Sequence, residues 1–249
     1  MIGRLLASAL VSGLLTGVLI SVIQEFTTTP IILHAEAFEG AGGHDDHAAL
    51  MWTDEVSGGQ FYLAHSAEEH EGEEGVWGPQ GGLERTLFTT AANLIAGVGF
   101  AALLVAGFQL AGRRIDGRAG LAWGVAGFVV FQLAPALGLP PEVPGSMAAD
   151  LAGRQFWWWF AVASTGVGVW LLLMVRALPL HVMGVLLIAL PHLVGAPQPD
   201  EIGGAVPPEL AGHFAAAALA TAFIFWALLG WLAGRSYQWF VERPQTATA

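Results

Sequence analysis

The stretch LFTTAANLIAGVGFAALLVAGFQLA, residues 87–111, contains no charged side chain. It is longer than the roughly 20 apolar residues that cross a lipid bilayer as a helix. The rest of the chain has a similar character, since only 12% of its 249 residues are charged and 55% are hydrophobic. A soluble globular domain carries about 25% charged residues. The sequence therefore predicts an all-α integral membrane protein.

The same criterion of length and apolar composition predicts five further spans. The shortest of them, Leu178–Val194, carries Pro179 and Pro191 close to its two ends, where a buried helix tolerates proline. We therefore predict a single membrane domain over residues 1–249, built as a bundle of about six transmembrane helices. The six predicted spans are Leu5–Phe26, Leu87–Ala111, Ala119–Leu139, Gln155–Val175, Leu178–Val194 and Ala211–Gly234.

The arginines are distributed unevenly between the predicted loops. Seven of the nine lie at the termini or in the second and fourth loops, and only Arg85 and Arg154 lie in the odd-numbered loops. Because cytoplasmic loops are enriched in basic residues, we predict that both termini are cytoplasmic. A cleaved signal peptide is the alternative for the first segment, since Arg4 precedes its apolar run. That run is too long for a signal peptide, so a retained helix is favoured.

Small and polar residues inside the spans predict how the helices pack. Glycines four residues apart let two helix backbones approach closely. The amides of Asn93, Gln109 and Gln132 are expected to form hydrogen bonds between helices, and the run FWWWF at residues 156–160 is expected to anchor a helix end at the membrane interface. The glycine pairs are Gly13 and Gly17, Gly120 and Gly124, and Gly230 and Gly234.

Residues 28–86 form a predicted external loop between the first two spans. The loop holds twelve acidic residues and one arginine, a balance equal to the net charge of −11 of the whole chain. Its acidic, glycine-rich composition cannot bury enough apolar surface to fold alone, so we expect it to be flexible. It also contains five of the eight histidines, which are His34, His44, His47, His65 and His70.

Two interpretations of this loop are open: a solvated loop without a ligand role, and a segment that gathers metal ions. Carboxylates concentrate cations, and neutral imidazole is a ligand that suits cobalt, nickel, zinc and copper. The clustering of histidines with acids favours metal contact. Because imidazole must be neutral to bind metal, capture should weaken as pH falls through the histidine range.

Further candidate ligands lie near the predicted helix ends. His181 and His192 are eleven residues apart, which places them within about 20° of one helix face and about 16 Å apart along it. Ionisable groups at membrane depth indicate function by default, although a structural hydrogen bond is an equal interpretation for each one singly. An outer vestibule is predicted from His34, Glu36, Glu39, Asp150, His192 and His213. The full set of candidate metal ligands is His34, Glu36, Glu39, His44, His47, His65, His70, Asp150, His192 and His213.

Several classes of function are excluded or disfavoured. The chain contains no cysteine, which excludes disulfides and thiolate ligands, and no lysine, which excludes a phosphate-binding loop that ends in Gly-Lys-Ser/Thr. HEGEE, residues 70–74, lacks the second histidine of a zinc-protease motif. We expect no enzymatic activity, no bound cofactor and no nucleic-acid partner.

Five stretches carry a resemblance to a known family. They are ILHAEAFE within Ile31–Glu39, the segment Leu83–Leu104, GFVVFQLAPALGLPPEVPG at Gly127–Gly145, ADLAGRQFWW at residues 149–158 and ALPHLVGAPQP at Ala189–Pro199. In these stretches, which follow the same order and extend over nearly the whole chain, the sequence resembles the CbtA family of proposed cobalt transporter subunits.

The resemblance implies a permease-like subunit of the bacterial cytoplasmic (inner) membrane for Co²⁺, linked to cobalamin supply. It also implies a small partner subunit, CbtB, with one membrane helix and a histidine-rich tail. An accessory or regulatory membrane subunit without its own pathway remains the alternative, as does transport of another metal such as nickel. A homo-oligomer is left open.

Overall fold

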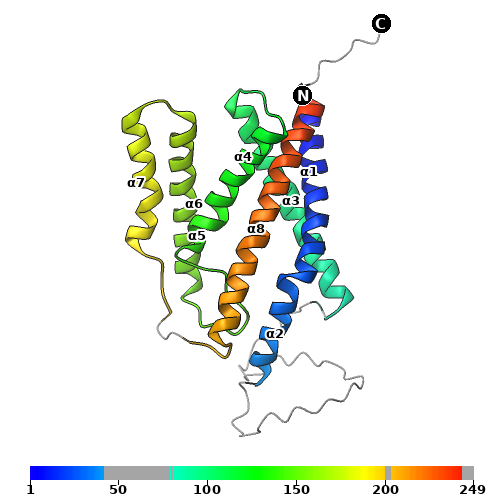
Figure 1. Cartoon of the computed structure of the whole chain (residues 1–249), viewed down its shortest axis with the longest axis vertical. Coiled ribbons are helices and arrows are strands. Elements are labelled where there is room, and N and C mark those ends of the chain that lie inside the picture. Colours follow the sequence, from blue (N-terminus) through cyan, green and yellow to red (C-terminus); the bar gives the residue numbers. More distant parts are fainter. Residues whose placement is uncertain (42–78, 80, 200–202, 243–249) are drawn as a thin grey trace.

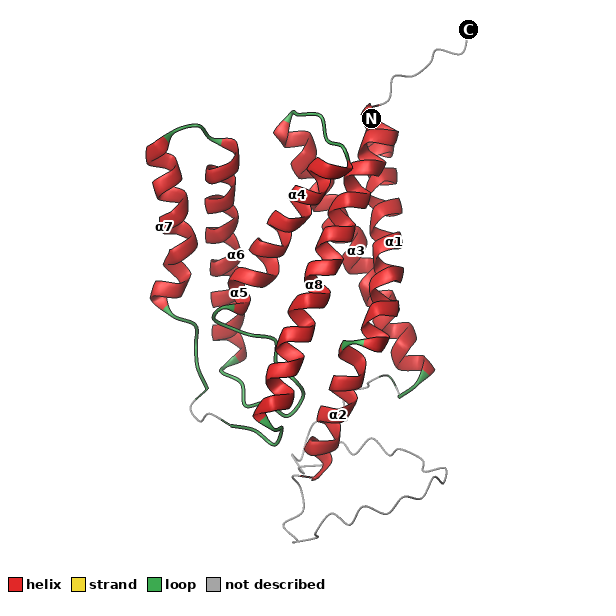
Figure 2. Cartoon of the chain, viewed as in Figure 1, coloured by secondary structure: helices red, strands yellow, loops and turns green. Residues whose placement is uncertain are grey.

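The computed structural model describes residues 1–41, 79, 81–199 and 203–242, and in this part of the chain the regular structure is helical apart from one isolated bridge between Ser146 and Gly204. Figures 1 and 2 show the helices side by side with their long axes roughly aligned. The helices are α1 (Ile2–Phe26), α2 (Thr28–Ala41), α3 (Leu83–Ala111), α4 (Gly117–Phe128), the π-helix η1 (Val129–Leu133), α5 (Ala134–Ala136), α6 (Leu151–Met174), α7 (Leu178–Val194), α8 (Pro208–Tyr237) and the π-helix η2 (Gln238–Glu242).

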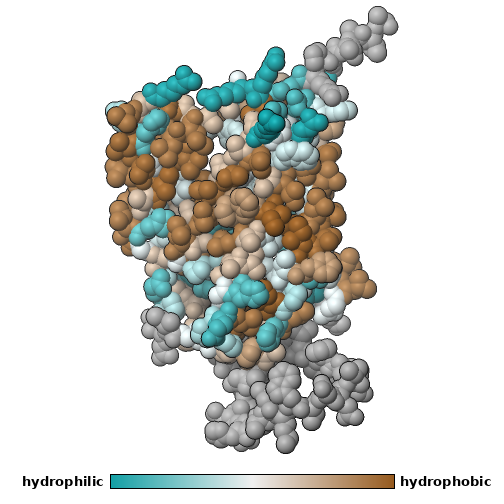
Figure 3. All heavy atoms as spheres, viewed as in Figure 1, coloured by the Kyte–Doolittle hydropathy of each residue, from teal (hydrophilic) through white to brown (hydrophobic). Residues whose placement is uncertain are grey.

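The structure confirms an all-helical chain with five candidate membrane-spanning helices among the described residues. By length and composition these are α1, α3, α4 with η1 and α5, α6, and α8 with η2. The sixth predicted span is α7, which has the predicted bounds but only 17 residues, so its length alone does not establish a crossing. Figure 3 shows a broad apolar band between two more polar ends on the face it displays, as expected for a bilayer-embedded bundle.

The helices divide the molecule into two ends. The start of α1, the α3–α4 turn, the α6–α7 turn and the end of α8 lie together, and we call this the inner end (Figure 1). The opposite end, which we call the outer end, contains α2 and the first turns of α6 and α8, and α7 ends short of it in the same half of the bundle. The placement of α1 and α8 agrees with termini on one side, while their cytoplasmic location remains a prediction.

The first part of the predicted external loop is helical, which differs from the expectation of a flexible loop over residues 28–86. α2 follows α1 after Thr27 alone, and Pro30 lies in its first turn, where the missing backbone donor has no helical partner to lose. Ala35 on α2 is fully buried and packs with Val143 and Val206. This tertiary burial stabilises a helix that local composition does not predict. Residues 42–78 lie outside the described residues, and so do His44, His47, His65 and His70.

The predicted glycine pairs lie at the closest helix contacts. A methyl group at Gly13 of α1 would lie 2.5 Å from the Cα of Val98 on α3, and one at Gly230 of α8 would lie 2.7 Å from the Cα of Gly124 on α4. Neither distance leaves room for a side chain, so the packing prediction is confirmed. We call this set of contacts the glycine core; its residues are Gly13, Gly17, Gly97, Gly120, Gly124, Gly230 and Gly234.

Two of the three predicted interhelical amides act as expected. Asn93 Nδ2 donates to Ser21 Oγ at 3.0 Å and to Gln24 Oε1 at 2.6 Å, which joins α3 to α1. Gln109 Oε1 accepts a hydrogen bond of 2.9 Å from Tyr237 Oη, which joins α3 to α8. Within the described residues no hydrogen bond of the Gln132 side chain is present, so the expectation does not extend to this residue.

α6 and α7 form a hairpin beside the other helices. Gly168 and Gly184 meet at its centre, where a methyl group on Gly168 would lie 2.6 Å from the Gly184 carbonyl oxygen. α7 packs mainly on α6, and α6 meets the rest of the bundle mainly at η1 and α5. The hairpin is therefore joined to the remaining helices chiefly through the π-helical stretch of the third span. π-helical turns inside α-helices are frequent at functional sites.

Candidate functional site

The predicted ligands that the structure describes lie on elements of the outer half of the bundle (Figure 1). His34 and Glu36 lie on α2, Asp150 precedes α6, His192 lies in the last turn of α7 and His213 lies near the start of α8. Glu39 also lies on α2, but its side chain is outside the described part. These residues lie in the same half of the bundle, and the outer vestibule itself remains a prediction.

The carboxylate of Glu36 is already paired. Arg85 Nη1, on α3, donates to Glu36 Oε2 at 2.9 Å, and Arg85 Nη2 donates to Glu36 Oε1. Both side chains are about three-tenths exposed, so this two-point ion pair is only partly screened by solvent. A metal ion at Glu36 would therefore have to compete with Arg85. Sequence analysis missed this partner because the two residues are 49 positions apart and belong to different helices.

Asp150 has a local structural role. Its Oδ2 accepts a hydrogen bond of 2.8 Å from the backbone nitrogen of Gly153, which caps the N-terminus of α6. An aspartate immediately before an apolar helical run is a common helix-start signal, and this signal was present in the sequence. The carboxylate is exposed, so its second oxygen is still accessible. Asp150 is therefore a helix cap whether or not it also contacts metal.

The exposed histidines of the outer end do not form a cluster. His34 packs against Phe38 of its own helix with ring centroids 5.5 Å apart, and His213 lies exposed on α8. His181, at the other end of α7, has Nε2 2.7 Å from the carbonyl oxygen of Val175 and so has a structural hydrogen bond. Among the described residues, no group of three or more His, Asp or Glu side chains is placed to hold a metal ion.

His192 differs from the other predicted ligands. Its ring packs edge-on against Trp157 of α6, with centroids 6.0 Å apart, and its Nε2 is buried without a hydrogen-bond partner. Buried polar atoms are satisfied in the large majority of cases, so an unpaired imidazole nitrogen calls for an explanation. A neutral imidazole nitrogen with a free lone pair is also what a transition metal binds. Among the candidate ligands that the structure describes, His192 is the one with a buried nitrogen that has no hydrogen-bond partner.

Trp157 belongs to the aromatic run that was expected to anchor the membrane interface. Its indole is 4% exposed and donates a hydrogen bond of 3.3 Å to the Pro191 carbonyl oxygen. Phe156 and Trp159 are exposed, so they are free to act as anchors. The anchor prediction is therefore wrong for Trp157, which instead joins α6 to the last turn of α7 beside His192.

The candidate membrane-spanning helices and the apolar band define a multi-pass membrane protein. A family model described as "Probable cobalt transporter subunit (CbtA)" matches residues 2–238, and the chain belongs to this family. Comparison with curated proteins and with solved structures gives no match.

Proposed function

We propose that the chain is a permease-like subunit for the uptake of a divalent transition metal, with Co²⁺ as the transported ion. The observation that carries the proposal is the family match over residues 2–238. The candidate membrane-spanning helices supply a scaffold for such a role, and the polar outer end supplies ligand types that suit cobalt. The expected location is the bacterial cytoplasmic membrane, with the outer end facing away from the cytoplasm.

In this proposal the acidic segment between α2 and α3 gathers the ion. Its carboxylates and histidines raise the local concentration of divalent cations by electrostatic attraction and weak coordination. The segment includes His44, His47, His65 and His70, whose placement lies outside the described residues. Gathering alone needs no fixed geometry, so the role rests on composition.

His192 is the proposed first ligand of the pathway itself. Its unpaired Nε2 can accept a metal if the ring rotates about its side-chain bonds away from Trp157. Transport requires that each site release the ion to the next, so a loosely assembled set of ligands suits it better than a closed cage. The scattered positions of Asp150, His34 and His213 agree with such weak, sequential contacts.

A second candidate is an accessory subunit without its own pathway. This candidate is favoured by the absence of a metal-ligand cluster among the described residues and by the ion pair that Glu36 forms with Arg85. In that case the proposed partner, a small subunit with one membrane helix and a histidine-rich tail, would provide the ligands that this chain lacks. Nickel remains an alternative cargo, because imidazole and carboxylate ligands do not separate it from cobalt.

Uptake of radioactive cobalt by sealed vesicles distinguishes these candidates. Vesicles would contain the purified chain alone, the small subunit alone or both, with excess nickel as competitor in a parallel series. A permease predicts cobalt uptake whenever this chain is present, with at most a stimulation by the partner. Equal uptake with and without this chain would sink the permease proposal, and stronger inhibition by nickel than by unlabelled cobalt would reassign the cargo.

Deletion of residues 44–74 tests the gathering role separately. The deletion removes four histidines and nine acids but leaves α2 and α3 intact. Uptake at scarce cobalt should fall, and the defect should shrink at abundant cobalt, because a gathering segment raises local concentration without forming the pathway. The same fractional loss at every concentration would instead assign the segment to a gate or a partner interface.

A further inference from the structure

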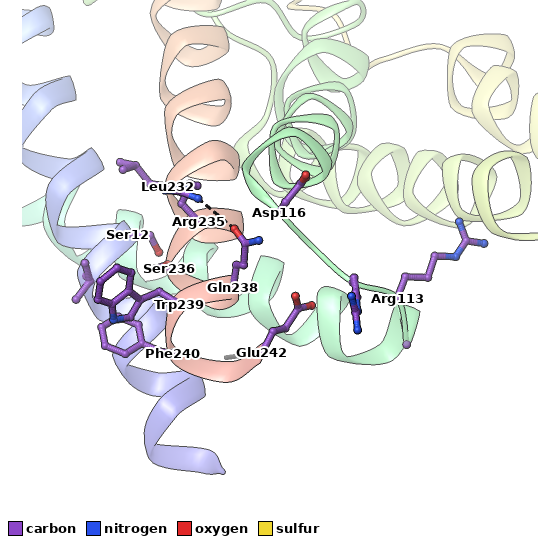
Figure 4. Close-up of a pocket in the computed structure, with 13 residues that line it drawn as sticks. Ser12, Arg113, Asp116, Leu232, Arg235, Ser236, Gln238, Trp239, Phe240 and Glu242 are labelled. Atoms are coloured by element: carbon purple, nitrogen blue, oxygen red, sulfur yellow. Dashed lines mark hydrogen bonds between the residues drawn. The ribbon is translucent and has the colours of Figure 1, made fainter. Parts of the chain in front are cut away.

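Two cavities meet at the inner end, at a pair of arginines. The first, of about 1100 Å³, lies between α1, the α3–α4 turn and the end of α8 with η2, and Figure 4 shows the side chains around it. Its charged lining consists of three arginines and two acids, which are Arg113, Arg114, Arg235, Asp116 and Glu242. The balance of charge in this cavity is therefore positive.

The acids of this cavity have partners within the protein. Asp116 Oδ1 accepts a hydrogen bond of 2.8 Å from the backbone nitrogen of Ala119, and Glu242 Oε1 accepts one of 2.9 Å from the backbone nitrogen of Ile115. Arg113 and Arg114 are exposed, and neither forms an ion pair or a side-chain hydrogen bond with the described residues. Two guanidinium groups with free donors thus line a polar cavity.

The second cavity, of about 430 Å³, is apolar and lies between α3, α4 and α6. Its walls include Trp123, Phe131 and Trp170, and Trp226 contributes from α8. Apart from the two arginines, the side chains around it are apolar. Its volume falls in the range of about 300–1000 Å³ that is usual for small-molecule sites.

The second cavity follows from the way the α6–α7 hairpin is attached. α6 meets the bundle mainly at η1 and α5, toward the outer end, while α4 is held against α8 by the glycine core. Trp123 and Trp170 approach across the remaining space with ring centroids 6.4 Å apart. The hairpin and the core therefore leave an apolar crevice between them on the inner half of the bundle.

Arg113 and Arg114 line both cavities, so the polar and apolar spaces are adjacent. An occupant of both must be an amphiphile with a negatively charged head. Arginine binds phosphate through two parallel hydrogen bonds, and basic pockets between membrane helices on the cytoplasmic side bind anionic lipid headgroups. We propose that this site binds one anionic phospholipid of the membrane, with an acyl chain in the apolar cavity and the phosphate at Arg113 and Arg114.

The proposal is tested with the full chain by native mass spectrometry after reconstitution in phosphatidylglycerol or phosphatidylcholine and extraction into detergent. The wild-type protein should retain phosphatidylglycerol more strongly than phosphatidylcholine. The double variant Arg113→Gln, Arg114→Gln should lose that preference, by about fivefold for each arginine removed. Arg118→Gln is the matched control, because Arg118 is an exposed arginine of the same region that lines neither cavity.

A second variant addresses the acyl chain. Ala126→Phe fills the apolar cavity and should reduce retention of both lipids, whereas Leu121→Phe, on an exposed position of α4 outside the cavity, should not. Equal retention of the two lipids by the wild type, an unchanged preference in the double arginine variant or full retention in Ala126→Phe would each overturn the proposal. The wild-type comparison decides the question even if a variant does not fold. A small membrane protein that copurifies and displaces the lipid from the wild type would also count against it.

Discussion

The glycine core and the outer end differ in what their residues must provide. At Gly230 the neighbouring α4 backbone occupies the space of any side chain, so the position accepts glycine alone. At the outer end, Glu36 and Asp150 each provide hydrogen-bonding oxygens to one partner, a role that another side chain could share. The packing of the bundle therefore depends on positions that carry no side chain, whereas the polar end depends on hydrogen bonds that other side chains could also form. A route that binds and releases an ion needs polar side chains or carbonyls that can exchange partners, and in this chain such side chains are found at the polar end rather than in the glycine core.

The largest effect is expected from Gly230→Leu. The new side chain would overlap the backbone of Gly120 and Gly124, and because backbone cannot move aside as a side chain can, the cost should exceed the usual overpacking penalty of about 1–3 kcal/mol. The variant should lose its monodisperse peak in size-exclusion chromatography. Gly212→Leu, on the same helix with no atom near its added carbon, should behave as wild type. A Gly230→Leu protein that folds normally would show that the glycine core tolerates a side chain, and would contradict its distinction from the outer end.

A smaller effect is expected from the Glu36–Arg85 ion pair. Glu36→Gln or Arg85→Gln should each lower stability by about 1 kcal/mol, because the pair is two-pronged but partly exposed. The double variant should be no less stable than either single one, as measured by thermal unfolding in detergent. Glu84→Gln, next to Arg85 on α3, is the control for loss of a negative charge. Additive losses in the double variant would show that the two side chains act independently.

The smallest effect is expected at Asp150. Asp150→Ala should lower stability by about 0.5 kcal/mol through loss of an exposed helix cap, while Asp150→Asn should retain the cap and the stability. Cobalt uptake should follow the same order if capping is the main role of this residue. Normal stability combined with lost uptake in Asp150→Asn would show that the carboxylate charge contacts the ion.

The spans were predictable from the sequence because each depends on one continuous apolar run. α7 has the predicted bounds Leu178–Val194, and the glycine pairs lie at the predicted contacts, since spacing along one helix determines which residues share a face. α2 was missed because its stability comes from Ala35 packing on residues more than a hundred positions away. α7 is the exception among the spans, because its 17 apolar residues have the composition of a span without its usual length.

For the candidate site, only the helix ends on which its residues lie were predictable. Residues at the ends of predicted spans must gather at one end of a bundle, which is why His192, Asp150 and His213 were placed together. Their partners depend on tertiary contacts that no local pattern encodes, such as Arg85 on Glu36 and Trp157 on His192. The cap at Asp150 is the exception, since an acid before an apolar helix signals it directly.

The most direct test of the proposed route is cobalt uptake by His192→Ala. Cells that lack other cobalt importers would express the variant together with the small partner subunit, at an insertion level matched to wild type. We expect no uptake of radioactive cobalt even at high metal concentration. The defect in His181→Ala should be milder, because the His181 ring forms a hydrogen bond with the Val175 carbonyl oxygen. Normal uptake by a folded, inserted His192→Ala protein would contradict the account, and would move the proposed site to His34, Glu36 and Glu39.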